Sequence, residues 1–220
     1  MLPVFPMKIH EGQHVLHGGP PLAKASAVLV LVHGRGASAE DIYSLGEEVA
    51  SGIQGVALLA PQAAGNVWYP QRFLAPLAQN EPQLSSALGV IDNLVEEAAQ
   101  SGPGYGRIVL LGFSQGACLA LEYALRHSRR YGGVVGLSGA LIGPLGGPRS
   151  LKDSLSGTPV YVGCSDRDVH IPLSSVEESV EILERHGARV TKSIFPGIGH
   201  TVNAEELDAA RRIVRDAAGV

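Results

Sequence analysis

IVLLGFSQG, residues 108–116, is the most informative segment of this 220-residue chain. Its first part, Ile108–Gly112, is a short continuous run of aliphatic residues, which is typical of a strand covered on both faces. Its second part is a G-x-S-x-G pattern that separates this strand from an expected helix. A sharp strand-to-helix turn needs small residues around its centre, and it exposes the hydroxyl of Ser114 above the sheet. The segment therefore predicts a strand, a tight turn with Ser114 at its apex, and a helix.

Similar aliphatic runs recur along the chain and alternate with amphipathic stretches. Further buried strands are expected at Val28–Val32, Val56–Ala60, Val134–Leu137 and Val160–Cys164, and a more polar outer strand at Arg189–Phe195. Helices are expected around the apolar stripe Leu84, Leu88, Ile91, Val95 and Ala98, and at Leu173–His186 and Ala204–Asp216. This alternation predicts a single α/β domain over residues 1–220, with a mostly parallel central sheet and helices on both faces.

Local signals add detail at the ends of these elements. The spacing of a capping box at a helix N-terminus occurs at Ser38 with Asp41 and at Asn203 with Glu206. The sequence GGPP at residues 18–21 is typical of a turn. We therefore expect His14–His17 to form an antiparallel hairpin with the run that begins at Ala27.

Composition and charge exclude several classes of protein. Hydrophobic residues make up 45% of the chain, enough for a large core, and the net charge of −4 provides no general attraction to nucleic acid or anionic membranes. The longest aliphatic run, Ala27–Val32, is too short to span a bilayer, and Met1–Met7 does not resemble a signal peptide. Cys118 and Cys164 are too few for a disulfide framework. We expect a cytoplasmic protein with no nucleic-acid partner and no stable membrane insertion.

Ser114 needs a neighbouring base to act as a nucleophile, because a serine hydroxyl alone reacts poorly. His200 is the best placed of the eight histidines, since it ends the glycine-rich loop PGIGH, residues 196–200, between the last strand and the last helix. His170 is the competing histidine, but it lies between two aliphatic residues, where we expect it to pack or to face solvent. We therefore predict His200 as the base.

A carboxylate that orients the base is expected in GCSDRD, residues 163–168, which follows the strand at Val160. Asp166 and Asp168 both lie at the C-terminal end of that strand. Sequence chemistry leaves the two as open alternatives, because either could cap a turn or pair with Arg167. The chain order serine, aspartate, histidine is the order found in α/β-hydrolases.

A second glycine-rich turn, HGRG at residues 33–36, follows the strand at Val28. Glycines allow the backbone to approach a substrate oxyanion, so an amide of this turn could join the amide of Gln115 as a pair of hydrogen-bond donors. The alternative is an ordinary turn with Arg35 in solvent. The pattern thus suggests an oxyanion hole.

The early histidines offer a different chemistry. His10, His14 and His17 could form a metal cluster, but no carboxylate pattern and no cysteine ligand accompanies them. We therefore expect neither a metal nor a cofactor.

The segment Pro61–Pro82 has no clear periodicity, and loops of this length are usually functional or mobile. Its bulky apolar residues stand out in a chain with only 5% aromatic residues, and they include Trp68, Phe73, Leu74 and Leu77. We expect the segment to overhang Ser114 and these four residues to line an acyl pocket. The alternative is that they bury themselves beneath the loop.

These segments together resemble the phospholipase/carboxylesterase family, which includes acyl-protein thioesterases and lysophospholipases. The matching elements run from about Val28 to the end: HGRG at 33–36, AP at 60–61, GFSQGA at 112–117, D-x-x-x-P at 168–172 and GIGH at 197–200. The resemblance implies an α/β-hydrolase fold without a separate lid domain. It also implies Asp168 as the acid, because the family's acid precedes a proline by four residues, and the amides of Arg35 and Gln115 as oxyanion donors.

The function implied is that of a serine carboxylesterase, which hydrolyses short- to medium-chain esters through Ser114, His200, Asp168 and an acyl-enzyme intermediate. The stretch GNVWYP at 65–70 is similar to a bacterial esterase branch, and Arg35 departs from the aliphatic residue of the better-known thioesterases. Open alternatives are a lysophospholipase or acyl (thio)esterase with longer acyl specificity, and a non-catalytic ligand-binding protein on the same fold. A homodimer is suggested by the resemblance alone.

Overall fold

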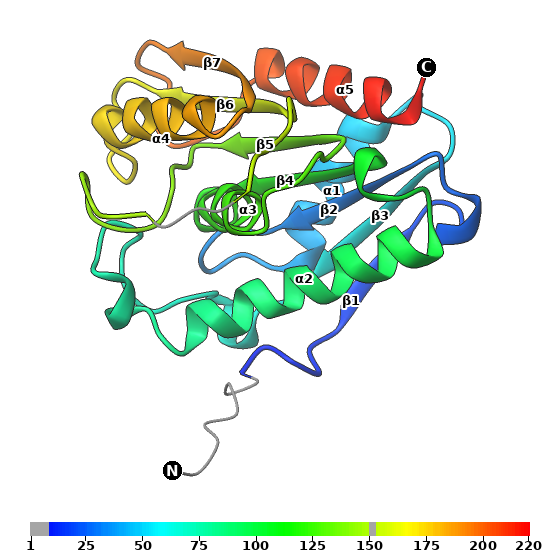
Figure 1. The fold of residues 1–220 in the computed structure, drawn as a ribbon, viewed down its shortest axis with the longest axis horizontal. Helices are drawn as coiled ribbons and strands as arrows, with labels where there is room; N and C mark the ends of the chain where they lie inside the picture. The colour runs from blue at the N-terminus through cyan, green and yellow to red at the C-terminus, as the bar shows by residue number, and fades with distance from the viewer. Residues whose placement is uncertain (1–8, 150–152) are drawn as a thin grey trace.

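The computed structural model describes residues 9–149 and 153–220 and has a seven-stranded sheet at its centre (Figure 1). The strands are β1 (Val15–Gly18), β2 (Ala27–Val32), β3 (Val56–Pro61), β4 (Ile108–Phe113), β5 (Gly133–Leu137), β6 (Pro159–Ser165) and β7 (Arg189–Phe195). Their order across the sheet is β1-β3-β2-β4-β5-β6-β7, with β1 antiparallel to β3 and the other neighbours parallel. The predicted mostly parallel sheet is confirmed.

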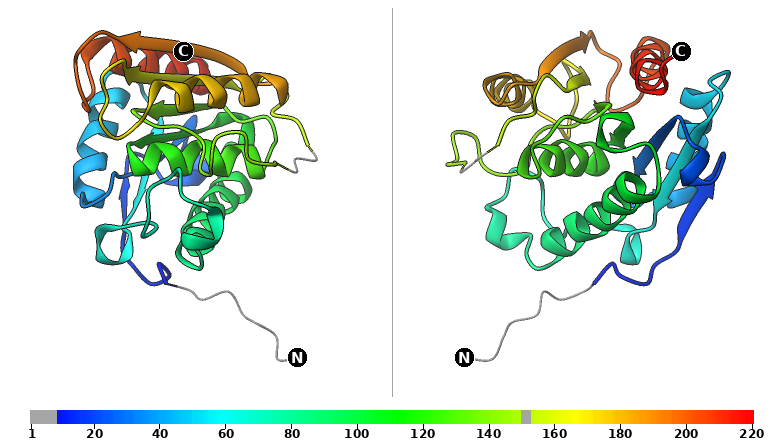
Figure 2. Two further views of the ribbon diagram at one scale, coloured as in Figure 1. Left: turned by 90° about the vertical axis from the view of Figure 1, so that its left-hand side faces the viewer. Right: turned by 45° about the vertical axis from the view of Figure 1, so that its right-hand side comes forward.

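Helices cover both faces of this sheet (Figures 1 and 2). They are α1 (Ala39–Ala50), α2 (Gln83–Ser101), α3 (Gln115–Arg126), α4 (Leu173–Arg185) and α5 (Ala204–Ala218), with short 3-10 turns at Leu22–Lys24, Ala64–Asn66, Leu77–Gln79 and Tyr105–Arg107. α1 and α5 pack against one face, and α2, α3 and α4 pack against the other. In the described part of the chain, every helix is too short or too polar to cross a bilayer.

Successive residues of each central strand enter the two cores alternately. In β2, Val28 and Val30 belong to the core beneath α2 and α3, whereas Leu29 and Leu31 belong to the core beneath α1 and α5. Because side chains alternate along a strand, a strand covered on both faces is apolar at every position. Each fully buried Val or Leu contributes about 1.5–3 kcal/mol. This double burial explains the continuous aliphatic runs.

The predicted elements form with small changes at their ends. Each predicted strand of the parallel sheet is observed with its limits moved by no more than one residue, and the polar strand Arg189–Phe195 lies at the sheet edge. The helix predicted at Leu173–His186 ends at Arg185, and the last helix continues to Ala218. Both capping boxes are present at the N-termini of α1 and α5. The sequence-based outline of the fold is therefore confirmed.

The predicted hairpin is wrong in its partner strand. The segment predicted at His14–His17 does form β1, but β1 pairs with β3, with Val15 opposite Pro61. Both edges of β2 are occupied by the parallel strands β3 and β4, so the free edge of β3 is the position available to β1. The chain crosses from β1 to β2 through Gly19, whose φ of +73° favours glycine, and through the 3-10 turn Leu22–Lys24.

Candidate active site

Ser114 occupies the sharp turn between β4 and α3. Its φ of +55° and ψ of −117° are rare for a residue other than glycine, and its N–H donates to the carbonyl of Leu137 at 2.9 Å. The flanking glycines allow the backbone segments to approach closely. A Cβ at Gly112 would overlap the carbonyl of Gly116, and a Cβ at Gly116 would overlap the carbonyl of Val32. Only glycine at both positions allows α3 to start directly above β2 and β4.

Ser114, His200 and Asp168 form a continuous hydrogen-bonded line. The Oγ of Ser114 lies 2.8 Å from Nε2 of His200, and Nδ1 of His200 lies 2.7 Å from Oδ2 of Asp168. The other carboxylate oxygen accepts from the backbone amides of His170 at 2.8 Å and Ile171 at 3.0 Å. An ionised carboxylate can only accept, so it places the imidazole proton on Nδ1. The lone pair of Nε2 then faces the serine hydroxyl.

Asp168 is suited to remain ionised although its side chain is fully buried. Burial alone would raise the pKa of this carboxyl group. The hydrogen bonds from His200 and from the amides of His170 and Ile171 outweigh burial, and the pKa of Asp168 is lowered below its usual value. A negative charge therefore stays next to the imidazole throughout the neutral pH range.

Asp166, the second candidate acid, has a different position. It is exposed, and its Oδ1 accepts from the amide of Gly197 at 2.8 Å. Gly197 belongs to the loop that carries His200, so Asp166 helps to hold the shape of that loop. The imidazole of His200 contacts Asp168 instead.

Arg35 and Gln115, the residues whose amides are the predicted oxyanion donors, line the same cavity as Ser114. Gln115 is the first residue of α3, so its N–H belongs to the free donors at the helix N-terminus. The turn that carries Arg35 is fixed by the amide of Gly36, which donates to the carbonyl of Asn66 at 2.7 Å. Two such residues beside a serine hydroxyl agree with the predicted oxyanion hole, whose donors would be their backbone amides.

The side chain of Gln115 ties the overhanging loop to α3. It is buried, its Oε1 accepts from the amide of Trp68 at 2.9 Å, and its Nε2 donates to the carbonyl of Tyr69 at 2.9 Å. The expectation that the segment Pro61–Pro82 overhangs Ser114 agrees with this arrangement, because Tyr69 and Phe73 line the cavity.

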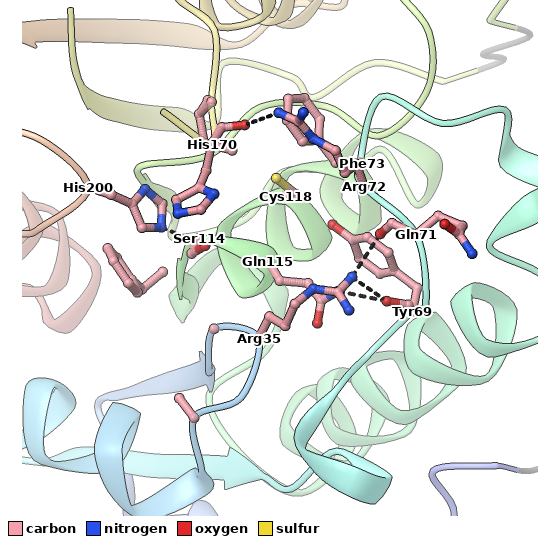
Figure 3. A pocket seen from close by; sticks show the side chains of 14 residues that line it. Arg35, Tyr69, Gln71, Arg72, Phe73, Ser114, Gln115, Cys118, His170 and His200 are labelled. Carbon is pink, nitrogen blue, oxygen red and sulfur yellow. Dashed lines mark hydrogen bonds between the residues drawn. The ribbon is translucent and has the colours of Figure 1, made fainter. Parts of the chain in front are cut away.

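The cavity beside Ser114 has a volume of about 270 Å³ (Figure 3). Its apolar walls come from Tyr69, Phe73, Phe113 and Cys118. Burial raises the pKa of the Cys118 thiol to about 12, so this thiol stays neutral and does not compete with Ser114 as a nucleophile. The cavity can hold a small, largely apolar group against the serine.

Trp68, which was expected to line this cavity, does not reach it. Its side chain is completely buried, and its Nε1–H donates to the carbonyl of His33 at 2.9 Å. Its ring contacts the rings of His10 and His33, with centroid separations of 5.4 and 4.9 Å. The expectation for Trp68 is corrected: the indole N–H needs a buried acceptor, and the carbonyl of His33 provides it on the core side of the loop.

The other three residues expected to line the cavity lie in different environments. Phe73 belongs to the buried core and also lines the cavity, Leu74 is partly buried against the core, and Leu77 is exposed on the 3-10 turn Leu77–Gln79. Their shared apolar character therefore did not place them on one wall. The alternative, burial under the loop, applies to Trp68 and Leu74.

Several wall residues were missed by the sequence analysis. Phe113, Arg72 and Ile171 line the cavity, and the ring of His170 lies 4.8 Å from the ring of His200. The position of Phe113 inside the G-x-S-x-G pattern was a usable signal for its proximity. Arg72 and His170 carry no such signal. Arg72 Nη2 donates to the His170 carbonyl, but the two residues are 98 positions apart in the sequence, so no local pattern brings them together.

Two histidines, His10 and His33, have hydrogen-bond partners in the backbone of the overhanging loop, and His14 lies 3.3 Å from a carboxylate oxygen of Glu40. His33 Nε2 accepts from the amide of Ala63 at 3.1 Å, and His10 Nδ1 accepts from the amide of Ala64 at 3.1 Å. Burial lowers the pKa of both imidazoles, although backbone carbonyls partly oppose this effect. Among the described residues, no group of three or more His, Cys, Asp or Glu side chains could hold a metal ion. His10 and His33 thus support the overhanging loop as neutral side chains that accept hydrogen bonds from its backbone.

Proteins of similar sequence and fold are known. The chain is similar to a crystal structure of a phospholipase/carboxylesterase from Dyadobacter fermentans DSM 18053, with 38% identity, a TM-score of 0.87, and coverage of 96% of this chain and 99% of that one. It is 25% identical over 213 residues to an acyl-protein thioesterase 1 of Yarrowia lipolytica, covering 86% of this chain and 90% of the relative.

A second thioesterase relative is more similar in sequence than the Yarrowia protein but matches a shorter region. An acyl-protein thioesterase 1 of Gibberella zeae is 34% identical over 125 residues, and the match spans 56% of this chain and about half, 53%, of that protein. The model of the phospholipase/carboxylesterase family matches residues 19–217, nearly the whole chain. The protein is therefore a hydrolase of the carboxylic ester type and belongs to the phospholipase/carboxylesterase family.

Proposed function

We propose that the protein is a serine carboxylesterase that hydrolyses short- to medium-chain esters through an acyl-enzyme intermediate. The observation that carries this proposal is the hydrogen-bonded line from Ser114 Oγ through His200 to Asp168, which lies beside a cavity lined by Ser114 and His200. A serine, a neutral imidazole in the correct tautomer and a buried carboxylate are the groups that acyl transfer requires.

The mechanism follows from these positions. Nε2 of His200 takes the proton of Ser114 as Oγ forms a bond to the ester carbonyl carbon, and the oxyanion is held by the amides of Arg35 and Gln115. The tetrahedral intermediate collapses, the bond to the alcohol oxygen breaks, and the imidazolium donates its proton to the departing alcohol. Water then attacks the acyl-enzyme by the same route and releases the acid. Asp168 fixes the tautomer and stabilises the imidazolium.

The size of the cavity supports short acyl groups. A volume of about 270 Å³ lies just below the range of about 300–1,000 Å³ that is usual for ligand pockets. Each methylene that fits contributes about 0.8 kcal/mol, whereas a methylene that does not fit remains in water or clashes. We therefore propose an activity maximum at short to medium chains.

The second candidate is a thioesterase, which would use the same residues on a thioester carbonyl. The names of the Yarrowia and Gibberella relatives, both acyl-protein thioesterases, favour this candidate. Nothing in the line of Ser114, His200 and Asp168 distinguishes an oxygen ester from a sulfur ester. Only the leaving group differs.

The test is a series of 4-nitrophenyl esters from acetate to dodecanoate, together with one acyl thioester of the preferred chain length. We expect hydrolysis to peak at short to medium chains, and Ser114→Ala to abolish it. Asp166→Asn is the matched control, because it removes a nearby carboxylate that does not contact His200. A fluorophosphonate should label the wild-type protein at Ser114. Absence of both labelling and turnover would contradict the proposal and favour a non-catalytic binding protein.

A further inference from the structure

The charged side chains that line the cavity are all of one sign, positive. Arg35 and Arg72 both line the cavity, and none of its described lining residues is Asp or Glu. No ion pair joins either arginine to a carboxylate in the described part of the chain. The carboxylate next to the cavity, Asp168, is buried and engaged by His200. The cavity therefore has cationic groups without neutralising partners, although the whole chain has a net charge of −4.

Arg35 is held in place rather than free in solvent. Its Nη2 donates to the carbonyls of Tyr69 at 2.7 Å and Gln71 at 2.8 Å (Figure 3). These two bonds occupy one nitrogen, so Nε and Nη1 remain available at the cavity. A guanidinium fixed through one nitrogen loses little freedom when the others bind an anion.

Arg72 is positioned by a separate set of contacts. Its backbone carbonyl accepts from Nδ2 of the buried Asn80 at 3.2 Å, and the neighbouring amide of Gln71 donates to Oδ1 of Asn80 at 2.8 Å. Its Nη2 makes one long bond, 3.2 Å, to the carbonyl of His170. The backbone at Arg72 is therefore fixed, whereas most of the guanidinium donors stay free.

The geometry of the reaction decides which part of a substrate meets these arginines. The departing alcohol must receive its proton from Nε2 of His200, so the alcohol lies next to that ring. The acyl chain extends away from His200 into the cavity, which is lined by Arg35 beside Tyr69 and Gln71 and, at a separate place, by Arg72 at the carbonyl of His170 (Figure 3). A negative group at the far end of a short acyl chain would lie in that region.

We propose that the preferred substrates are half-esters of dicarboxylic acids, in which a free carboxylate at the end of the acyl chain is bound by Arg35 and Arg72. This inference rests on the proposed esterase function and adds the charge of the acyl group. Guanidinium groups match carboxylates in shape and charge, and such bonds are stronger than neutral ones. The short, partly polar cavity suits an acid that has few methylenes and a charged end.

The test compares two isosteric esters, 4-nitrophenyl hydrogen adipate and 4-nitrophenyl adipamate, in which an amide replaces the carboxylate. Adipate avoids the rapid self-hydrolysis of succinate and glutarate half-esters. We expect the wild type to prefer the anion by about tenfold in kcat/KM, mainly through KM. Arg72→Gln and Arg35→Gln should each reduce this preference by about threefold or more. High salt should reduce it as well, since these charges are partly exposed.

Arg185→Gln is the matched control, because it removes the same charge at the far end of α4, where Arg185 is exposed. It should leave the ratio of the two esters unchanged. Equal or lower activity towards the anionic ester in the wild type would overturn the proposal, as would arginine variants that slow both esters by the same factor. That second result would assign Arg35 and Arg72 to structural support of the loop.

Two further outcomes separate this proposal from the proposed function. Turnover of neither ester, or turnover that survives Ser114→Ala, would contradict the esterase function itself. A preference for 4-carboxyphenyl acetate over 4-carbamoylphenyl acetate, with none for adipate, would overturn the placement of the anion on the acyl side.

Discussion

The contrast between Trp68 and Phe73 yields a prediction in which stability and specificity separate. Trp68→Phe removes the indole N–H that donates to the carbonyl of His33 in a fully buried position. An unpaired buried carbonyl costs about 1–3 kcal/mol, and the smaller ring leaves a void, so we expect a total loss of about 2–4 kcal/mol. This is less than the stability of a typical domain, about 5–15 kcal/mol, so the variant should fold.

Phe73→Ala should lower stability as well, because Phe73 is buried, but it should also act on the substrate. Phe73 lines the cavity beside Ser114, so the truncated side chain leaves room for additional methylenes of the acyl chain. Each methylene that gains a buried position contributes about 0.8 kcal/mol, which is about fourfold in kcat/KM. The chain-length optimum should therefore move towards longer esters in Phe73→Ala.

The assay is the 4-nitrophenyl ester series, with urea unfolding of each variant measured in parallel. Trp68→Phe should lower the midpoint of unfolding and leave the rank order of the esters unchanged. Phe73→Ala should change the rank order. A shift of the optimum in Trp68→Phe, or a uniform loss across the series in Phe73→Ala, would refute this reading of the cavity.

Three other perturbations have expected outcomes. Asp168→Asn should lower kcat by about 10³–10⁴-fold, because the amide favours the wrong imidazole tautomer. Asp166→Asn should lower kcat by less than tenfold. The reverse order in steady-state kinetics would show that the acid is Asp166. Burial lowers the pKa of His10 and His33, so below about pH 6.5 the unfolded chain binds protons that the folded chain does not. The free energy of unfolding should therefore fall as the pH drops below about 6.5. Above that pH it should not depend on these two groups. Urea unfolding at pH 7.5 and 5.5 measures this, and His10→Gln should reduce the difference; equal slopes in both proteins would contradict it. Glu122→Gln should lower stability by about 3 kcal/mol in urea unfolding, because the buried carboxylate accepts bonds from two arginines and one amide; no loss would show that this buried cluster is not stabilising.

The sequence predicted the strands and the turn at Ser114 because their signals are local. A strand buried on both faces must be aliphatic at every position, and the elbow requires glycine at positions 112 and 116, where any Cβ would overlap backbone. Both constraints act on neighbouring residues, so a single sequence displays them. The partner of β1 is not a local property, because it depended on which strands already occupied the edges of β2.

The same distinction between local and non-local signals applies to the candidate site. Ser114, Asp168 and His200 each follow a strand, and parallel strands bring their C-terminal ends to one edge of the sheet, so their meeting could be predicted. The residues of the cavity wall could not be predicted, because they come from loops. Whether a loop side chain lies in the core or at the cavity depends on the hydrogen-bond partners that the fold provides. Trp68 entered the core because a buried carbonyl was available to its indole N–H.

The central claim is that Ser114 and His200 act as one catalytic unit. Its most direct test is the kcat of Ser114→Ala, His200→Ala and the double variant on the best 4-nitrophenyl ester. Each single change should lower kcat by about 10⁴–10⁶, and the double variant should be scarcely slower than either, because the loss of one member already disables the other. Losses that multiply in the double variant, or a Ser114→Ala protein that retains most of its activity, would contradict the account.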